Sequence, residues 1–216
     1  CVYRNYTNRS YKGGQDDNFG GGDGGTVREL CRHADIKHID LCEIDGEVVR
    51  VAKKFFPSVS SKLLDERVNI HIGDGIKFIS KAQSKFDIII IDSTDPVGPG
   101  EVLFTQEFYH SVSQALKPGG IMVAQSESPW GNKSVLSRIY NNIAAEFSSV
   151  HPYIGSIPTY PRGLWSWTLA CNDAGIISKY NEKRFNKIKN GLKYLTSAVM
   201  ASPFDIPRFY QEKILC

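Results

Sequence analysis

The stretch GGGDGGTVRELCRHADIKHIDLCE, residues 20–43, decides the fold class of this chain. Its glycine-rich turn opens a segment in which Val27, Leu30 and Cys31 fall on one side of a predicted helix. A short apolar run over residues 38–42 follows, is predicted to be a strand, and ends at Glu43. A turn, a helix and a strand that ends in a carboxylate are typical of a ligand-binding α/β sheet.

Strand and helix patterns alternate along the chain to about residue 172. Such alternation predicts a parallel sheet that is covered by helices on both faces. The fold class is therefore α/β, with a Rossmann-like sheet. The predicted strands are residues 38–42, 68–72, 86–91, 121–125 and 165–171, and the predicted helices are residues 24–33, 46–56, 105–116 and 134–147.

The composition is that of one domain with nearly balanced charge. The 216 residues include 26 Lys and Arg against 23 Asp and Glu, which gives a formal charge of +3. This balance argues against nucleic acid or an anionic membrane as a partner, and no apolar run is long enough to span a bilayer. Residues 1–18 lack a signal core, and the cysteines and histidines lack metal-ligand spacing. We expect a cytoplasmic protein without a metal site.

The segment before the glycine-rich turn does not have the composition of a central strand. An apolar strand should precede such a turn, but residues 10–19 are SYKGGQDDNF. We therefore expect residues 1–19 to be an atypical or incomplete segment and residues 20–216 to form the domain. The first strand of the main sheet is expected to be missing.

Acidic residues follow three of the predicted strands, namely Glu43, Asp74 and Asp92. Ligands of open α/β sheets bind outside the carboxyl ends of the strands, so these residues are expected to share one rim of the sheet. One such residue could be an ordinary turn residue, and Asp74 between Gly73 and Gly75 remains open to that interpretation. Three of them beside a glycine-rich turn indicate a binding site.

The glycine-rich turn also predicts the kind of ligand. Glycines let the backbone approach a ligand closely, and Glu43 lies 21 positions after Gly22, a spacing that suits a carboxylate on ribose hydroxyls. Asp74 would then reach the amino group of adenine. Asp23 would repel a pyrophosphate or a carboxylate and attract an ammonium group. The turn therefore favours a cationic nucleoside over a dinucleotide.

A second acidic segment, DSTDPVGP at residues 92–99, follows the most apolar predicted strand. One of its two carboxylates could anchor the distal ammonium group of a polyamine. The other could accept the proton that an alkylamine must lose before it can attack. The alternative is a solvated acidic turn without a chemical role.

Six motifs, taken in order, resemble the spermidine synthase family of polyamine aminopropyltransferases. They are GGGDGG at 20–25, EID at 43–45, GDG at 73–75, DSTDPVGP at 92–99, QSE at 125–127 and IPTYP at 157–161. The resemblance covers about residues 20–216. It implies a sheet of about seven strands like that of S-adenosylmethionine-dependent methyltransferases, and a homodimer. It also implies decarboxylated S-adenosylmethionine as co-substrate without a prosthetic group, and putrescine or a related polyamine as acceptor.

The roles of single residues are implied by the matching motifs. Asp92 is the expected general base, and the Tyr160 hydroxyl is expected to help orient the attacking amine. The expected acceptor-binding residues are Asp95, Gln125 and Tyr160. The expected donor-binding residues are Gly21, Gly22, Asp23, Gly24, Glu43, Asp74, Gly75 and Pro99, with Asp23 on the aminopropyl ammonium.

The front of the chain departs from this family, which has an N-terminal domain of β-hairpins. With that domain apparently missing, a chain of these residues alone is expected to be unstable and nearly inactive. Two other functions remain open, namely an S-adenosylmethionine methyltransferase, against which Asp23 argues, and a non-catalytic partner subunit that binds a nucleoside. Agmatine, spermidine or cadaverine could also replace putrescine.

None of the three tryptophans is expected to have a catalytic role. Trp165 and Trp167 alternate in a predicted strand, which favours packing. Trp130 follows Pro129 near the predicted rim and could border the pocket.

Overall fold

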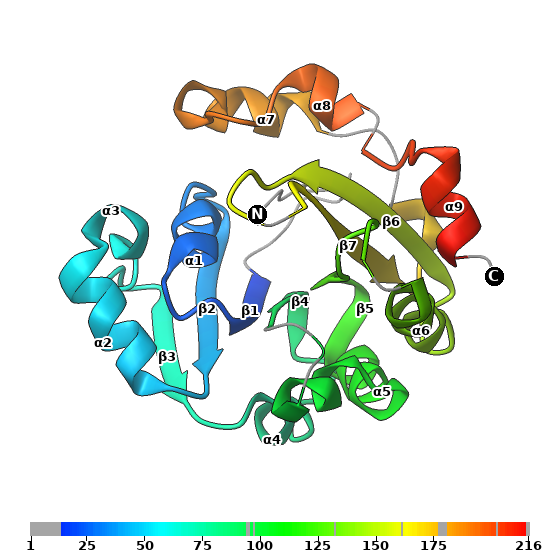
Figure 1. Cartoon of the computed structure of the whole chain (residues 1–216). Helices are drawn as coiled ribbons and strands as arrows, with labels where there is room; N and C mark the ends of the chain where they lie inside the picture. Colours follow the sequence, from blue (N-terminus) through cyan, green and yellow to red (C-terminus); the bar gives the residue numbers. More distant parts are fainter. Residues whose placement is uncertain are drawn as a thin grey trace.

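A seven-stranded sheet forms the centre of the computed structural model, which describes residues 14–93, 96, 98–131, 133–160, 162–176, 181–201 and 203–214. Its order is β3-β2-β1-β4-β5-β7-β6 (Figure 1). β1 to β5 run parallel, and β7 is antiparallel to both neighbours. The predicted α/β class is confirmed. The strands are β1 Gly14–Gly20, β2 Ile36–Glu43, β3 Val68–Ile72, β4 Phe86–Asp92, β5 Leu116–Gln125, β6 Ser149–Ser156 and β7 Leu164–Cys171.

Helices cover both faces of this sheet (Figure 1). α1 Gly25–Leu30 and α2 Gly46–Phe55 pack on one face. α4 Gly75–Ile79, α5 Gln106–Ala115 and α6 Lys133–Ala144 pack on the other. The remaining helical elements are α3 Pro57–Ser60, α7 Glu182–Ile188, α8 Ser197–Ala201, α9 Arg208–Ile214 and the 3₁₀ turns η1 Gly98–Phe104, η2 Ala174–Ile176 and η3 Lys189–Gly191.

The central strand β4 has the sequence FDIIIID and is buried on both faces. Ile89 and Ile91 enter the hydrophobic cluster under α4, α5 and α6, whereas Ile88 and Ile90 enter the cluster under α1 and α2. Successive side chains of a strand point to opposite faces, so an unbroken isoleucine run supplies both layers of core. The strand ends at Asp92, a half-buried residue at the carboxyl end of the sheet.

The expectation that the sheet lacks its first strand is wrong. Residues 14–20 form β1, which lies between β2 and β4 and pairs with both. A parallel ladder is made by backbone N–H and C=O groups, and these are present whatever side chains the strand carries. Residues 1–13 lie outside the described part of the chain.

One edge strand was not predicted from the sequence. β6 contains Pro152 and Gly155, which are rare inside strands. It pairs with β7 and lies at the end of the sheet order, where a residue without an N–H group is tolerated. Among the described residues, no helix is long and apolar enough to cross a membrane.

The glycine-rich turn rests on a buried leucine. Gly24 has a φ of 87°, a conformation that glycine adopts at little cost. A Cβ atom at this position would lie 2.7 Å from Leu63 Cγ, so the leucine packs directly against the turn. Leu63 is 3% exposed, whereas its neighbour Leu64 is 82% exposed. The two leucines therefore form a matched pair for a stability experiment.

Replacing Leu63 by alanine is expected to lower the free energy of unfolding by about 2–4 kcal/mol, because it leaves a cavity under the turn. Leu64→Ala is expected to change it by less than about 0.5 kcal/mol. Urea denaturation followed by circular dichroism measures both. Equal losses in the two variants would show that Leu63 does not support the turn.

Candidate active site

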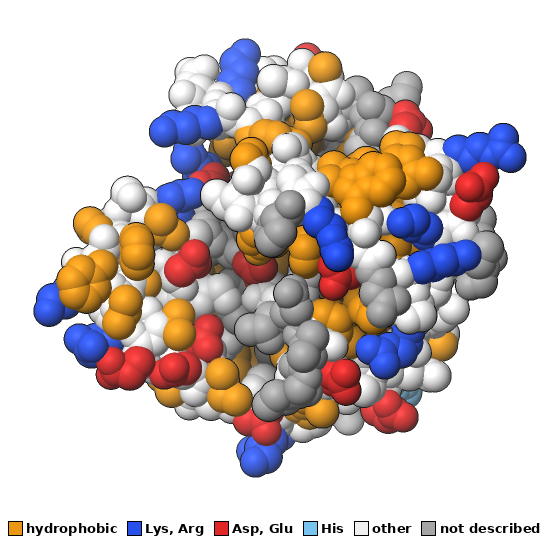
Figure 2. Space-filling view, viewed as in Figure 1, with side chains coloured by type: hydrophobic (Ala, Val, Ile, Leu, Met, Phe, Trp, Pro, Cys, Tyr) orange, Lys and Arg blue, Asp and Glu red, His pale blue; other side chains and the backbone are white. Residues whose placement is uncertain are grey.

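Strand register brings the predicted site residues to one rim of the sheet. Gly20, the last residue of β1, lies opposite Asp92, the last residue of β4. Phe19 lies opposite Cys42, so the glycine-rich turn leaves the sheet between Glu43 and Asp92. Acidic side chains gather near the middle of the face seen in Figure 2. The carboxyl ends of β1, β2 and β4 therefore meet around this turn.

The carboxylate of Glu43 connects two turns. Its Oε2 accepts a hydrogen bond from the backbone N–H of Gly22 (3.1 Å), and its Oε1 accepts one from the N–H of Asp45 (3.1 Å). A Cβ atom at position 22 would lie 2.7 Å from Glu43 Oε2, so only glycine leaves room for this contact. Each carboxylate oxygen carries two lone pairs. Glu43 can therefore accept further hydrogen bonds from the hydroxyl groups of a ligand.

Asp23 projects from the turn itself. The turn closes with a hydrogen bond from the Gly24 N–H to the Gly21 carbonyl (2.9 Å), and both glycines have a positive φ. Asp23 is exposed, and its Oδ1 accepts a hydrogen bond from the Gly25 N–H (2.9 Å). This contact fixes the direction of the side chain. A negative charge is thus presented at the start of α1.

Asp92 is tied to the first turn of α1. The buried hydroxyl of Thr26 donates a hydrogen bond to Asp92 Oδ2 (3.2 Å). Burial raises the pKa of Asp92 above its usual range, the charge of Asp23 raises it further, and the Thr26 hydroxyl opposes the shift. A carboxylate with a raised pKa accepts a proton more readily, which suits a general base. Thr26 was not predicted as a site residue from the sequence.

Asp74 has a structural role at the end of β3. It is the N-cap of α4, and its Oδ1 accepts hydrogen bonds from the N–H groups of Ile76 (2.9 Å) and Lys77 (3.4 Å). Gly75 is the first residue of that helix. The ordinary turn role considered for Asp74 is therefore present. A role toward a ligand would use Oδ2.

Exposed isoleucines adjoin Glu43 and the Gly73-Asp74 turn, and they were not predicted as site residues from the sequence. Ile44 directly follows Glu43 and is 76% exposed, and Ile72 precedes the Gly73-Asp74 turn and is 55% exposed. Large apolar side chains left in solvent beside polar groups are typical of a ligand surface. The signal in the sequence was an apolar residue at the end of a predicted strand, as for Ile72, or directly after one, as for Ile44.

Gln125 and Tyr160 meet at one tryptophan. Gln125, the last residue of β5, is 4% exposed, and its Oε1 accepts a hydrogen bond from Trp165 Nε1 (2.9 Å). Tyr160, in the loop between β6 and β7, packs edge-on against the Trp165 ring, with 4.7 Å between ring centroids. Gln125 Nε2 also donates to the carbonyl of Ser93, the residue after Asp92 (3.3 Å). The structure therefore connects these residues to the rim.

Other predicted residues are placed differently or are not described. Asp95 lies outside the described residues. Pro99 belongs to η1, but its side chain also lies outside them. The Trp130 ring stacks on Phe209 of α9, with centroids 4.3 Å apart and planes at 8°. The exposed Trp130 ring is therefore covered in part by the last helix.

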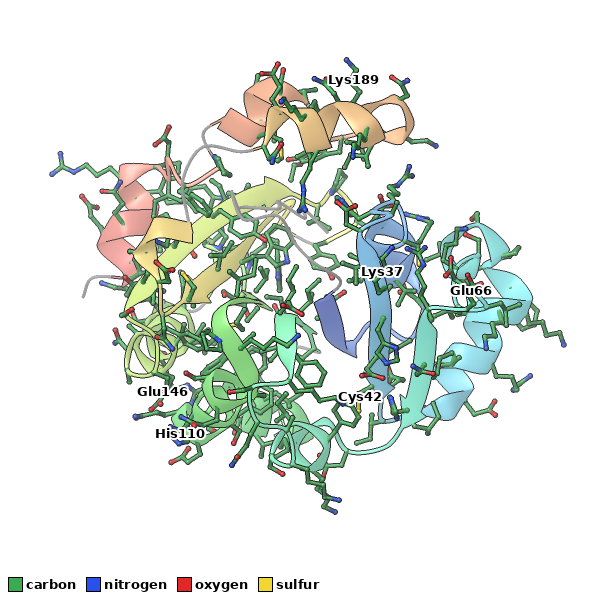
Figure 3. All side chains as sticks on the ribbon, turned by 180° about the vertical axis from the view of Figure 1, so that it is seen from behind. Lys37, Cys42, Glu66, His110, Glu146 and Lys189 are labelled. Atoms are coloured by element: carbon green, nitrogen blue, oxygen red, sulfur yellow. The ribbon has the colours of Figure 1, made fainter. Side chains whose placement is uncertain are left out.

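The described part of the chain contains no cluster of His, Cys, Asp and Glu that could hold a metal ion. The histidines instead make pairwise contacts. His110 lies beside Glu146 on the back of the molecule (Figure 3), and the two side chains are joined by a 2.8 Å hydrogen bond. His38 and His71 both contact the buried carboxylate of Asp40.

A glycine-rich turn and carboxylates at the carboxyl ends of the central strands are the features of a Rossmann-like α/β domain with its ligand site at that rim. The sequence model of the spermine/spermidine synthase domain matches residues 19–184. The chain belongs to this family and is an aminopropyltransferase of the spermidine synthase type.

Individual relatives support this assignment along most of the chain. It is 44% identical over 196 residues to a polyamine aminopropyltransferase of Thermoplasma volcanium, covering 91% of this chain and 68% of the relative. It is 42% identical over 199 residues to the enzyme of Caldicellulosiruptor bescii, covering 91% and 69%. A crystal structure of a spermidine synthase in complex with the transition-state analogue AdoDATO superimposes with a TM-score of 0.89 at 35% identity, covering 94% and 70%.

Two substitutions around Asp92 are expected to move its pKa in opposite directions. Asp23→Asn removes a neighbouring negative charge and should lower the pKa of Asp92, whereas Thr26→Val removes a hydrogen bond to the ionised form and should raise it. Titration of the side-chain carboxyl carbon by ¹³C NMR measures both shifts. Shifts of the same sign would contradict the arrangement described for Asp92.

Proposed function

We propose that this protein transfers the aminopropyl group of decarboxylated S-adenosylmethionine to putrescine, which yields spermidine and 5′-methylthioadenosine. The observation that carries the proposal is that two carboxylates, Asp23 and Asp92, both accept hydrogen bonds from the first turn of α1. Donor and acceptor are both cationic. Two anionic groups beside a nucleoside-binding turn suit that pair of substrates.

The donor would lie along the glycine-rich turn. Glu43 keeps lone pairs for the two ribose hydroxyls. Asp74 Oδ2, which lies 3.7 Å from Lys77 Nζ and makes no capping contact, would accept a hydrogen bond from the adenine amino group. Ile44 and Ile72 supply apolar surface for the base. Four glycines would let the backbone approach the donor, namely Gly21, Gly22, Gly24 and Gly75. Pro99 is also proposed to contact the donor. Asp23 would bind the ammonium group of the aminopropyl chain.

The reaction is an alkyl transfer by direct displacement. The lone pair of the acceptor nitrogen attacks the methylene carbon next to the sulfonium, the carbon–sulfur bond breaks, and its electron pair remains on sulfur. The acceptor nitrogen gives up a proton, which passes to the Asp92 carboxylate. The sulfonium is already a good leaving group. Catalysis then consists of alignment of the two substrates and removal of one proton.

The acceptor would extend from Asp92 toward Gln125 and Tyr160. The Tyr160 hydroxyl would orient the attacking amine, and Asp95 would anchor the distal ammonium group. This arrangement suits a flexible diamine such as putrescine. Agmatine, spermidine and cadaverine are the competing acceptors, and parallel assays with each of them rank the preference. We also propose a homodimer, which light scattering in solution tests.

The sequence left open methyl transfer from S-adenosylmethionine on the same fold, and membership of the aminopropyltransferase family argues against it. That donor carries a carboxylate beside its ammonium group, and Asp23 would repel it. A nucleoside-binding subunit without catalysis is the second rival. It would bind 5′-methylthioadenosine but would produce none from donor and putrescine.

The first test concerns the choice of donor. Calorimetry is expected to show decarboxylated S-adenosylmethionine binding about 10-fold more tightly than S-adenosylmethionine, the equivalent of about 1.4 kcal/mol. Asp23→Asn should reduce that ratio to about threefold or less. Asp35→Asn changes the net charge equally but lies before β2, at the opposite end of the sheet, and should leave the ratio unchanged. Equal or tighter binding of the carboxylated donor would refute the aminopropyl donor.

The second test concerns the general base. Asp92→Asn is expected to reduce turnover by about 10²- to 10⁴-fold, because the amine loses its proton acceptor. Asp87→Asn is the matched control, since Asp87 lies in the same strand but pairs with Lys117 at the other end (2.8 Å). Asp87→Asn should keep most of the activity. An Asp92→Asn variant with more than half of the parent turnover would exclude Asp92 from the mechanism.

A further inference from the structure

The side-chain amide of Gln125 is held in one orientation. Its Oε1 accepts a hydrogen bond from the indole N–H of Trp165 at 2.9 Å, and the backbone N–H of Glu127 lies 3.4 Å from the same oxygen. Its Nε2 donates to the Ser93 carbonyl at 3.3 Å. A flipped amide would turn its NH₂ group toward two donors, and a buried donor without an acceptor is costly. The oxygen of Gln125 therefore faces Trp165, and the nitrogen faces the residue after Asp92.

The backbone around Trp165 keeps this geometry in place. Glu127 has a φ of 85°, a left-handed conformation that is uncommon for a residue other than glycine. Its carbonyl accepts hydrogen bonds from both the N–H (3.0 Å) and the hydroxyl (2.6 Å) of Ser166, which follows Trp165 in β7. The N–H of Ser126 donates to the Ser166 carbonyl (2.9 Å). Strand β7 thus fixes the segment after Gln125 as well as the Trp165 ring.

The same tryptophan also contacts Tyr160. The two rings meet edge to face, with an interplanar angle of 82°. Trp165 is 8% exposed and Tyr160 is 45% exposed, so a buried ring packs against a partly exposed one. Edge-to-face aromatic pairs of this kind have a preferred geometry. One indole therefore touches both residues that the proposed function assigns to the acceptor amine.

We propose that Trp165 is a positioning residue for the acceptor amine, acting through its N–H group on Gln125 and through its ring on Tyr160. The proposal rests on the proposed function for the assignment of Gln125 and Tyr160. It predicts that loss of the indole N–H group weakens binding of the acceptor amine and leaves binding of the donor unchanged. Apart from Pro99, the proposed donor residues lie at or just after the ends of β1, β2 and β3, whereas Trp165 lies in β7.

Trp165→Phe keeps an aromatic ring and removes the N–H group. It is expected to raise KM for putrescine about 10-fold, as for one lost hydrogen bond, and to leave KM for the donor unchanged. Trp167→Phe is the matched control in the same strand. In the described part of the chain the Trp167 indole N–H makes no hydrogen bond, and its ring stacks on Tyr153 at 5.7 Å. This control should change KM for putrescine less than twofold.

A double-mutant cycle separates the hydrogen bond from general packing. In a Gln125→Met background, which has a similar shape and no amide, Trp165→Phe should raise KM for putrescine less than about twofold. Additive effects of the two substitutions would show that the hydrogen bond does not carry the role. An unchanged KM for putrescine in Trp165→Phe would overturn the proposal outright.

A measurement that does not depend on activity completes the test. The chain has three tryptophans, so its ¹H–¹⁵N spectrum contains three indole N–H signals, which single Trp→Phe variants assign. Gln125→Met should shift the Trp165 signal and leave the Trp167 signal in place. An unmoved Trp165 signal would refute the contact itself. If the unsubstituted protein did not turn over putrescine, the proposed function and this proposal would both be overturned. If it turned over putrescine normally but Trp165→Phe left KM for putrescine unchanged, this proposal alone would be overturned.

Discussion

The pairing of β1 with both β2 and β4 is the constraint on which the rest of the structure depends. It joins the β3-β2 half of the sheet to the β4-β5-β7-β6 half through two parallel backbone ladders. The register of these two ladders places Gly20 opposite Asp92 and starts the glycine-rich turn beside Glu43. A shift by one residue would turn every side chain of a strand to the other face. The site geometry therefore follows from the register of one strand.

The carboxylates of the sheet and its rim fall into two groups according to the hydrogen-bond donors that they contact. Asp40, buried within β2, contacts His71 at 2.8 Å, His38 at 3.2 Å and Lys85 at 3.6 Å. Asp23, Glu43 and Asp92 at the rim accept hydrogen bonds from backbone N–H groups or from one hydroxyl. Neutral donors orient a carboxylate without cancelling its charge. The proposed function assigns the rim carboxylates to cationic substrates, whereas Asp40 is paired with basic side chains inside the fold.

The segment after Gln125 is held from two sides. Ser166 of β7 binds the Glu127 carbonyl, and α9 reaches the other side, where Phe209 stacks on Trp130 and the Lys213 ammonium group donates to the Pro129 carbonyl. The buried Tyr210 and Ile214 pack the same helix against Leu136 of α6. A residue with positive φ costs free energy and persists only where its surroundings fix it. Helix α9 thereby supports the segment after Gln125, which the proposed function assigns to the acceptor.

The sequence by itself determined the α/β class, the two-sided burial of the isoleucine run in β4, and the rim that Glu43 and Asp92 share, because side-chain periodicity and strand ends are local properties. It also gave the family through motifs that keep their order along the chain. It failed for β1, whose composition is not that of a central strand, because a ladder between two neighbours needs only backbone groups. It could not connect Thr26 with Asp92, or Trp165 with Gln125, because these partners lie 66 and 40 positions apart. Such contacts exist only after β1, β4, β5 and β7 have been placed side by side, so only the tertiary structure decided them.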